Sequence, residues 1–204
     1  MKKKIVLATI SIQPQGELQR IYYTKENSQE RYPYPVAYPC INMMEQMLED
    51  GDDVKVIALM SQDSQGRGLH NLEIFKQDIS DLNSRHGWNL QVDVVIPIPH
   101  EETRAKQVSL FREICRQYVE DAQIYMDITF GTKITSIGLF STLIYAENVK
   151  NCEICSIVYG KYLHQEETVG ELYDIKCVYD LNMLIGALDP RYGDVDKLLD
   201  TLWE

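Results

Sequence analysis

Four short apolar runs alternate with amphipathic segments along most of this chain, and this alternation constrains the fold more than any other feature. The runs are rich in Val, Ile and Leu, as expected for strands that are buried on both faces of a sheet. They span residues 3–9, 53–61, 90–98 and 122–129. Segments with helical spacing follow them at residues 36–50, 69–87, 102–121 and 133–147. This pattern predicts a mostly parallel sheet with helices on both faces.

The C-terminal part of the chain shows a different pattern. Two further apolar runs, residues 152–160 and 172–180, are joined by a polar segment, which predicts an antiparallel hairpin. Residues 181–188 and 194–204 have the spacing of short helices. We therefore expect a Rossmann-like three-layer α/β sandwich, with a ligand-binding domain at residues 1–180 and a helical extension at residues 181–204.

The charge balance limits the partners of the protein. The 204 residues include 20 Lys and Arg and 31 Asp and Glu, which gives a formal net charge of −11. This excess repels the phosphates of a long DNA or RNA chain, so we expect no such partner. A small anionic ligand is still allowed, because it needs only one local electropositive pocket.

Composition also bears on location and metal binding. No apolar run reaches the ~18 residues of a transmembrane helix, and the run at residues 5–10 is too short for a signal peptide. The five cysteines are scattered and odd in number, which favours reduced thiols. Cys152 and Cys155 form a CxxC pair in an expected strand, where they would point to opposite faces. We therefore expect a cytoplasmic protein with no membrane partner, no metal and no cofactor.

The segment YMDITFGTKITSIGLF, residues 125–140, places Gly131, Thr132 and Lys133 between an expected strand and an apolar helix. With a strand order of 3-2-1-4, the first and fourth strands are neighbours at the switch point where such sheets bind ligands. The loop at residues 9–13 would meet this segment there. Gly permits close approach of a ligand, Thr can cap the helix or bind a phosphate oxygen, and Lys adds a positive charge. These features predict a small anion site; the alternative is an ordinary helix start.

Two common nucleotide-binding signatures are absent. Neither GxGxxG nor GxxxxGK[ST] occurs anywhere in the chain. An ordinary dinucleotide-dependent dehydrogenase and a P-loop NTPase are therefore not expected.

Residues 127–133, DITFGTK, resemble the motif after the fourth strand of CARF domains, the CRISPR-associated Rossmann-fold sensors of cyclic oligoadenylates in antiviral defence. The resemblance extends over residues 3–202, although outside the motif it is one of topology. Phe130 and Thr132 depart from the DITHGFR form of the motif, whereas GTK is its other common form. The resemblance implies a homodimer that binds the ring across its two-fold axis. The residues implied to contact the ligand are Thr9, Ile10, Ser11, Asp127, Thr129, Gly131, Thr132 and Lys133.

The resemblance leaves the activity open. In a metal-independent ring nuclease, a ribose 2′-hydroxyl attacks its own 3′-phosphate and leaves a 2′,3′-cyclic phosphate, with Ser11 and Lys133 as the implied catalytic residues. The alternative is a non-catalytic sensor that regulates a partner or an effector domain. A small-molecule enzyme on a generic Rossmann-like fold is a third hypothesis, although no nucleophile elbow supports it.

Three further features each have two interpretations. Asp127 either orients its loop by accepting backbone N–H bonds or binds a ribose hydroxyl. The helix expected at residues 133–147 is apolar all round, so it either packs against the sheet and a second subunit or forms the centre of a monomer. Five tyrosines either stack on adenine or cover an edge of the core. They are Tyr22, Tyr23, Tyr32, Tyr34 and Tyr38.

Overall fold

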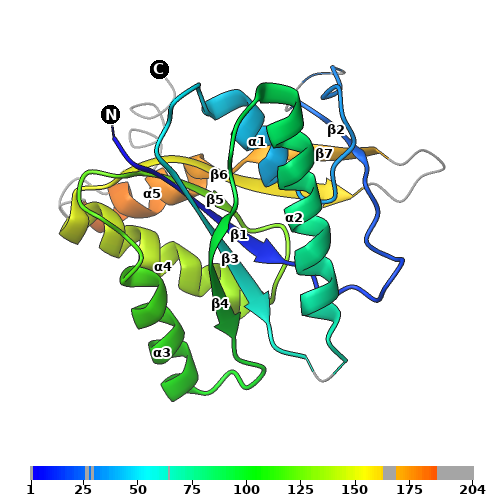
Figure 1. Ribbon diagram of the computed structural model, residues 1–204. Coiled ribbons are helices and arrows are strands. Elements are labelled where there is room, and N and C mark those ends of the chain that lie inside the picture. Colours follow the sequence, from blue (N-terminus) through cyan, green and yellow to red (C-terminus); the bar gives the residue numbers. More distant parts are fainter. Residues whose placement is uncertain (1, 26–27, 29, 64, 163–168, 188–204) are drawn as a thin grey trace.

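The computed structural model describes residues 2–25, 28, 30–63, 65–162 and 169–187, and within them seven strands form one sheet with five helices packed around it (Figure 1). The strands are β1 (Lys4–Ile10), β2 (Tyr22–Thr24), β3 (Val54–Ser61), β4 (Val92–Ile98), β5 (Gln123–Asp127), β6 (Glu153–Tyr162) and β7 (Val169–Asp174). The helices are α1 (Cys40–Met47), α2 (Arg67–His86), α3 (Arg104–Cys115), α4 (Lys133–Lys150) and α5 (Lys176–Ala187).

The strand order is β2-β7-β6-β5-β1-β3-β4. The neighbouring pairs β1–β3, β1–β5, β3–β4 and β5–β6 are parallel, and β6–β7 is antiparallel. The predicted order of the first four long strands is therefore confirmed, and β1 and β5 lie side by side. β4, which contains Pro97, lies at the edge of the sheet, where a residue without an N–H group interrupts no inner ladder.

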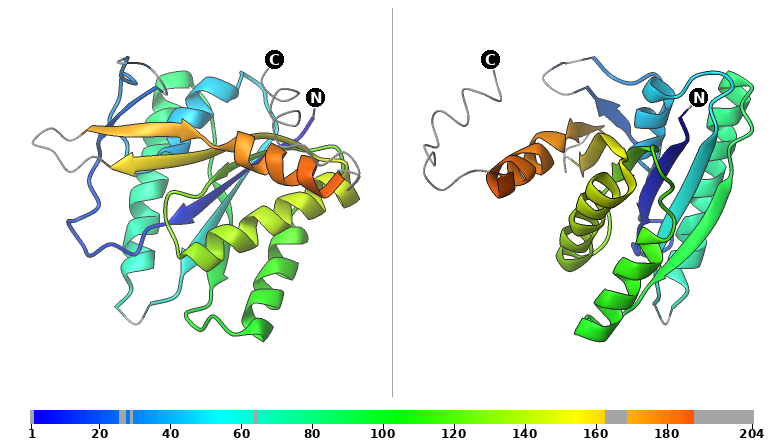
Figure 2. Two further views of the ribbon diagram at one scale, coloured as in Figure 1. Left: turned by 180° about the vertical axis from the view of Figure 1, so that it is seen from behind. Right: turned by 90° about the vertical axis from the view of Figure 1, so that its left-hand side faces the viewer.

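Helices cover both faces of the sheet, as the right-hand view of Figure 2 shows with α2 on one side and α3 and α4 on the other. Alternate residues of β1 point to these two layers. Val6 and Ala8 belong to a core cluster that contains residues of α1 and α2. Ile5 and Leu7 belong to a second cluster that contains residues of α3, α4 and α5. The predicted three-layer α/β sandwich is confirmed.

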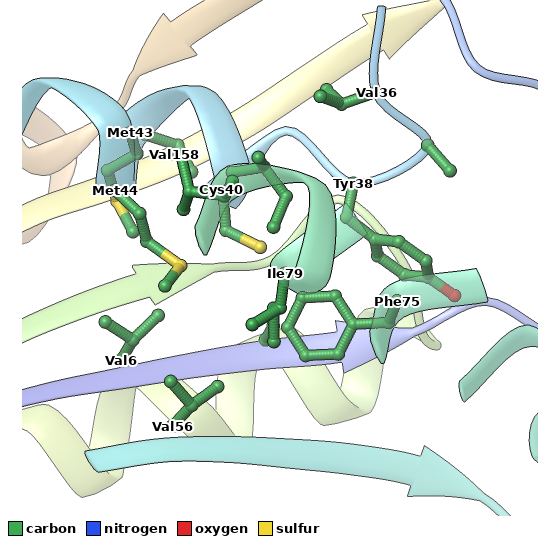
Figure 3. Packing of buried hydrophobic residues seen from close by; sticks show 14 of the residues in the cluster. Val6, Val36, Tyr38, Cys40, Met43, Met44, Val56, Phe75, Ile79 and Val158 are labelled. Atoms are coloured by element: carbon green, nitrogen blue, oxygen red, sulfur yellow. The ribbon is translucent and has the colours of Figure 1, made fainter. Parts of the chain in front are cut away.

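The layer formed by α1 and α2 has a densely packed aromatic and sulfur-containing core (Figure 3). Met43 and Met44 of α1 face Val6 of β1, and the rings of Tyr38 and Phe75 lie 4.9 Å apart between their centroids. All five of these side chains are at most 2% exposed. This packing fixes the segment before α1 close to the carboxyl ends of the central strands.

The hairpin at the C-terminal side differs from its prediction. β7 ends at Asp174 and α5 begins at Lys176, so the expected strand at residues 172–180 is wrong in its second half. The carboxylate of Asp174 accepts the N–H of Lys176 at 2.8 Å, which caps the helix, and Lys176 pairs with Asp180 one turn later. Tyr179 then points into the core cluster of α3 and α4. Residues 176–180, which were expected to continue the strand, form the first turns of α5.

The domain boundary remains a prediction. The expected division between residues 180 and 181 falls inside α5, which begins at Lys176. The expected helix at residues 194–204 lies outside the described residues. The structure therefore does not test the helical extension as a separate unit.

Candidate functional site

The loops that follow β1 and β5 meet, as the predicted strand order requires. Thr9 joins them: its hydroxyl donates to the carbonyl oxygen of Asp127 at 3.3 Å and accepts the N–H of Phe130 at 3.1 Å. The Thr9 side chain is fully buried. This hydroxyl thus both donates and accepts inside the protein, so Thr9 ties the end of β1 to the loop after β5.

Asp127 is 1% exposed, and its carboxylate accepts hydrogen bonds from two segments that meet at the end of β5. One oxygen accepts the N–H of Cys40, the first residue of α1, at 2.9 Å. The other accepts the N–H of Thr129 at 2.8 Å. Burial raises the pKa of Asp127, and the bonds from Thr129 and Cys40 oppose that rise. These contacts agree with the first interpretation of Asp127, in which it orients the loop.

The loop after β5 leads directly into α4. The hydroxyl of Thr129 accepts the N–H of Gly160 at 2.9 Å, which ties the loop to β6. Gly131 has a φ of +96°, a conformation in which a residue with a side chain is strained. Thr132 caps α4, because its hydroxyl accepts the N–H of Thr135 at 3.2 Å. Of the two roles considered for Thr132, the structure shows the helix cap, and binding of a phosphate oxygen remains a prediction.

Lys133 is the first residue of α4 and is exposed. Within the described part of the chain, no carboxylate forms an ion pair with its ammonium group. The positive end of the helix dipole lies at the same place. This helix start therefore combines a full positive charge with a partial one, on a chain whose net charge is −11.

Ile10 and Ser11 lie deeper than an open binding loop would suggest. The Ile10 side chain is fully buried in the cluster with α1 and α2. The Ser11 side chain is 1% exposed, and its hydroxyl accepts the N–H of Gln13 at 3.1 Å. The structure thus brings Thr9 to the β5 loop, whereas Ser11 is engaged within its own loop. Joint action of Ser11 and Lys133 on one ligand remains a prediction.

Asn71 of α2 shapes this loop and was missed in the sequence. Its amide nitrogen donates to the carbonyl oxygens of Ser11 and Gln13, at 2.9 and 3.0 Å. The Tyr38 hydroxyl donates to the backbone carbonyl oxygen of Asn71 at 3.0 Å. The only indication in the sequence is a polar residue beside Leu72 on the apolar face of a helix, and that does not reveal what the residue binds.

Two ion pairs of Arg20 anchor the rest of the loop after β1. The Arg20 guanidinium contacts Asp78 at 2.9 Å and Asp81 at 2.7 Å, both on α2. Asp78 also accepts the N–H groups of Ala37 and Tyr38, at 2.8 and 3.2 Å. Burial raises the pKa of Asp78 to about 6 from an ordinary value of 3.8, although Arg20 opposes this rise.

We expect Asp78→Asn to remove a pH dependence from the stability of the protein. Because folding raises the pKa of Asp78, its contribution to the free energy of unfolding is complete below pH 3.8 and is lost as the pH rises through about 6. The free energy of unfolding of the wild type minus that of the variant should fall by about 3 kcal/mol between about pH 4 and pH 7. Urea unfolding at both pH values measures it, and a constant difference would contradict the raised pKa of Asp78.

The five tyrosines divide into two groups. Tyr23, Tyr32 and Tyr38 are at most 7% exposed and belong to the core, which agrees with the packing interpretation. Tyr22 and Tyr34 are partly exposed. The Arg85 guanidinium lies 4.3 Å from the centroid of the Tyr34 ring, so a cation already occupies one face of that ring.

One face of α4 is open to solvent. Leu139 and Leu143 are buried against the sheet, whereas Ile134 is 42% and Ile137 69% exposed. The exposed isoleucines lie in the first turns of the helix, close in sequence to Lys133. A contact between these isoleucines and another molecule remains a prediction.

Fold and loop geometry together define the class: a Rossmann-like α/β protein with a positively charged helix start at the switch point of its sheet. Neither the protein-family models nor the curated proteins contain a match to this sequence.

Among the residues that the structure describes, no three His, Cys, Asp or Glu side chains gather as metal ligands do. Cys152 and Cys155 belong to clusters on opposite faces of the sheet, as predicted for the CxxC pair. None of the described helices combines the length and the apolar character needed to cross a lipid bilayer.

Proposed function

We propose that this protein binds a cyclic oligoadenylate as a homodimer, in the manner of the CARF proteins that its DITFGTK segment resembles. The observation that carries the proposal is the exposed ammonium group of Lys133 at the start of α4, with no ion-pair partner in the described part of the chain. The ligand phosphate lies against Gly131, Thr132 and Lys133, where a helix N-terminus favours negative charge.

The acidic composition of the chain supports a small ligand with few phosphates. A net charge of −11 opposes a long polyanion, whereas one local cation accommodates one or two phosphates. Thr9 and Asp127 hold the loop through buried hydrogen bonds, so the backbone around Gly131 is preorganised before the ligand arrives.

The exposed surface of α4 supports the proposed homodimer. A partner subunit covers Ile134 and Ile137, which are 42% and 69% exposed in the single chain. A two-fold axis near the start of α4 brings two copies of Lys133 together around one ring. The ring then supplies phosphates to both copies, and each subunit contributes one half of the site.

Binding without cleavage is the activity that the contacts favour. The Ser11 hydroxyl is 1% exposed and is engaged with the N–H of Gln13, so it is not presented to a ribose. Ring cleavage is the second candidate, because the Lys133 ammonium can stabilise the charge that develops on an attacked phosphate. Cleavage requires a rearrangement that releases Ser11, or catalysis by orientation of the ribose and by Lys133 alone.

A ligand screen with product analysis tests both candidates. Calorimetric titrations compare cyclic oligoadenylates of several ring sizes with linear oligoadenylate, mononucleotides and dinucleotides, and light scattering measures the mass. The proposal expects a dimer and a clear preference for one ring. A protein that binds no ring refutes it, and a preference for a mononucleotide or dinucleotide supports a small-molecule enzyme. Incubation of a labelled ring with and without EDTA then distinguishes a sensor, which leaves it intact, from a metal-independent nuclease.

A further inference from the structure

A groove of about 510 Å³ runs between α3 and α4, near the end of α4 that is opposite to Lys133. Its apolar wall includes Val108 and Phe111 of α3 and Tyr145 of α4. The rings of Phe111 and Tyr145 meet edge to face, with 6.2 Å between their centroids, and Val108 is 48% exposed. Within the described part of the chain, an apolar surface is therefore left open between the two helices.

Two arginines of the α3 segment border this groove. Arg112 and Arg116 are exposed and lie about one helical turn apart. Among the residues that the structure describes, no carboxylate forms an ion pair with either guanidinium group. Residues 104–116 contain four basic side chains and one acidic side chain, on a chain whose net charge is −11. The groove therefore suits an apolar helix that carries acidic residues along one side.

The chain after Ala187 contains a segment with these properties, at residues 194–204. It lies outside the described residues, and its sequence has four acidic side chains and one basic side chain. Five apolar side chains of this segment have the spacing of one helix face. They are Val195, Leu198, Leu199, Leu202 and Trp203.

The charges of the segment match those of the groove in spacing as well as in sign. Asp196 and Asp200 are four residues apart, so on a helix they lie ~6 Å apart along the axis, on one side of the apolar face. Arg112 and Arg116 are also four residues apart. Two acidic groups can therefore face two guanidinium groups at the same time.

The segment is also within reach of the groove. Figure 2 shows α4 between α5 and α3 in both views, and the Tyr179 hydroxyl of α5 donates to the Glu147 carboxylate of α4 at 2.6 Å. Packed helices have axes roughly 8–10 Å apart. Residues 188–193 can span up to ~20 Å when extended, which is enough to pass α4.

We propose that residues 194–204 dock as a helix in the groove between α3 and α4 of the same chain. Their apolar face covers Val108 and Tyr145, and their acidic pair lies beside the two arginines. This contact occupies the other end of α4 from Lys133, so it does not depend on the proposed binding of a ring.

Fluorine NMR of protein labelled with fluorotryptophan tests the docking, because the chain has two tryptophans and each gives its own signal. Trp203 belongs to the segment. Trp88 is the internal reference, since its indole nitrogen donates to Asp50 at 2.7 Å, away from the groove. In the wild type, the Trp203 signal should differ from its position in the unfolded protein and should not change with protein concentration.

Charge reversal then identifies the groove. Arg112→Glu combined with Arg116→Glu should move the Trp203 signal to its unfolded position, because the acidic segment is repelled. Asp196→Arg combined with Asp200→Arg should have the same effect. The protein with all four substitutions should regain the wild-type signal, since opposite charges face each other again.

A matched control reverses two other basic residues of α3. Arg104 and Lys106 are exposed and do not border the groove, so Arg104→Glu combined with Lys106→Glu should leave the Trp203 signal unchanged. An equal effect of this control would show that general charge, and not the groove, holds the segment, and would overturn the inference.

Three other results would overturn the inference. They are a Trp203 signal at its unfolded position in the wild type, a signal that depends on protein concentration and so places the segment on a second copy, and no recovery in the fourfold variant. If the reversed variants do not fold, nuclear Overhauser effects in the wild type decide. Their presence between the Trp203 ring and the side chains of Val108 or Tyr145 would support docking, and their absence would overturn it.

Discussion

Lys133→Ala is expected to weaken binding of a cyclic oligoadenylate by at least about 100-fold. The substitution removes one ammonium group from each subunit, and a hydrogen bond to a charged group contributes roughly 1.5–3 kcal/mol. The loss should be larger at low salt than at high salt, because ions screen an exposed charge. Calorimetric titration of the wild type and the variant at two salt concentrations measures it.

Two variants control this experiment. Lys133→Arg keeps the charge and should retain most of the affinity. Lys150→Ala removes a lysine from the other end of α4, where its ammonium lies 3.8 Å from Glu120, and should leave binding unchanged. Lys133→Ala should not lower the unfolding temperature, because it removes a positive charge from the positive end of the helix dipole, and Lys150→Ala should lower it only slightly, because it removes one exposed ion pair and one favourable dipole interaction. Equal weakening by Lys133→Ala and Lys150→Ala would show that general charge, and not the start of α4, attracts the ring.

Asp127→Ala should lower the free energy of unfolding by about 4 kcal/mol. It leaves the buried N–H group of Cys40 and the partly buried N–H group of Thr129 without their acceptor, and each unsatisfied donor costs roughly 1–3 kcal/mol. Relief of the burial of a carboxylate offsets only part of this loss. Urea unfolding followed by circular dichroism gives the difference.

Asp127→Asn refines the test, because its one oxygen can accept only one of the two N–H groups cleanly. It should destabilise the protein by an intermediate amount. Asp53→Ala is the control: its carboxylate is 65% exposed and pairs with Lys3 at the surface, so its loss should cost less than about 1 kcal/mol. If Asp127→Ala is as mild as Asp53→Ala, the carboxylate does not hold the loop in the way described.

Most of the sheet was predictable because its pattern is local. Continuous apolar runs such as residues 3–9 and 53–61 can be buried on both faces only in the middle of a parallel sheet, and β1 and β3 lie there. Right-handed crossovers then leave few strand orders, and the observed one was among them. The wrong strand prediction at residues 175–180 also arises from local pattern. A short stretch such as IKCVYD fits the spacing of a strand and that of a helix, and the hydrogen bond from the N–H of Lys176 to the Asp174 carboxylate stabilises the helix.

The candidate site was predictable only in part. The order Gly-Thr-Lys at residues 131–133 is enough to predict Thr132 as a helix cap. A tight turn at Gly131 is enough to predict its positive φ. The burial of Ser11 did not follow, because it depends on Asn71, which is 60 positions away in the chain.

Taken by itself, the amino-acid order determined which segments are strands and helices for most of the chain, and that a Gly, a Thr and a Lys stand at the start of α4. Hydrophobic periodicity and capping act over a few residues, so they can be read along the chain. Only the tertiary structure decided that Asp127 holds Cys40, which lies 87 positions away, that Ser11 turns inward, and that a groove opens between α3 and α4. These features depend on which distant groups meet when the layers pack, and no local pattern specifies that.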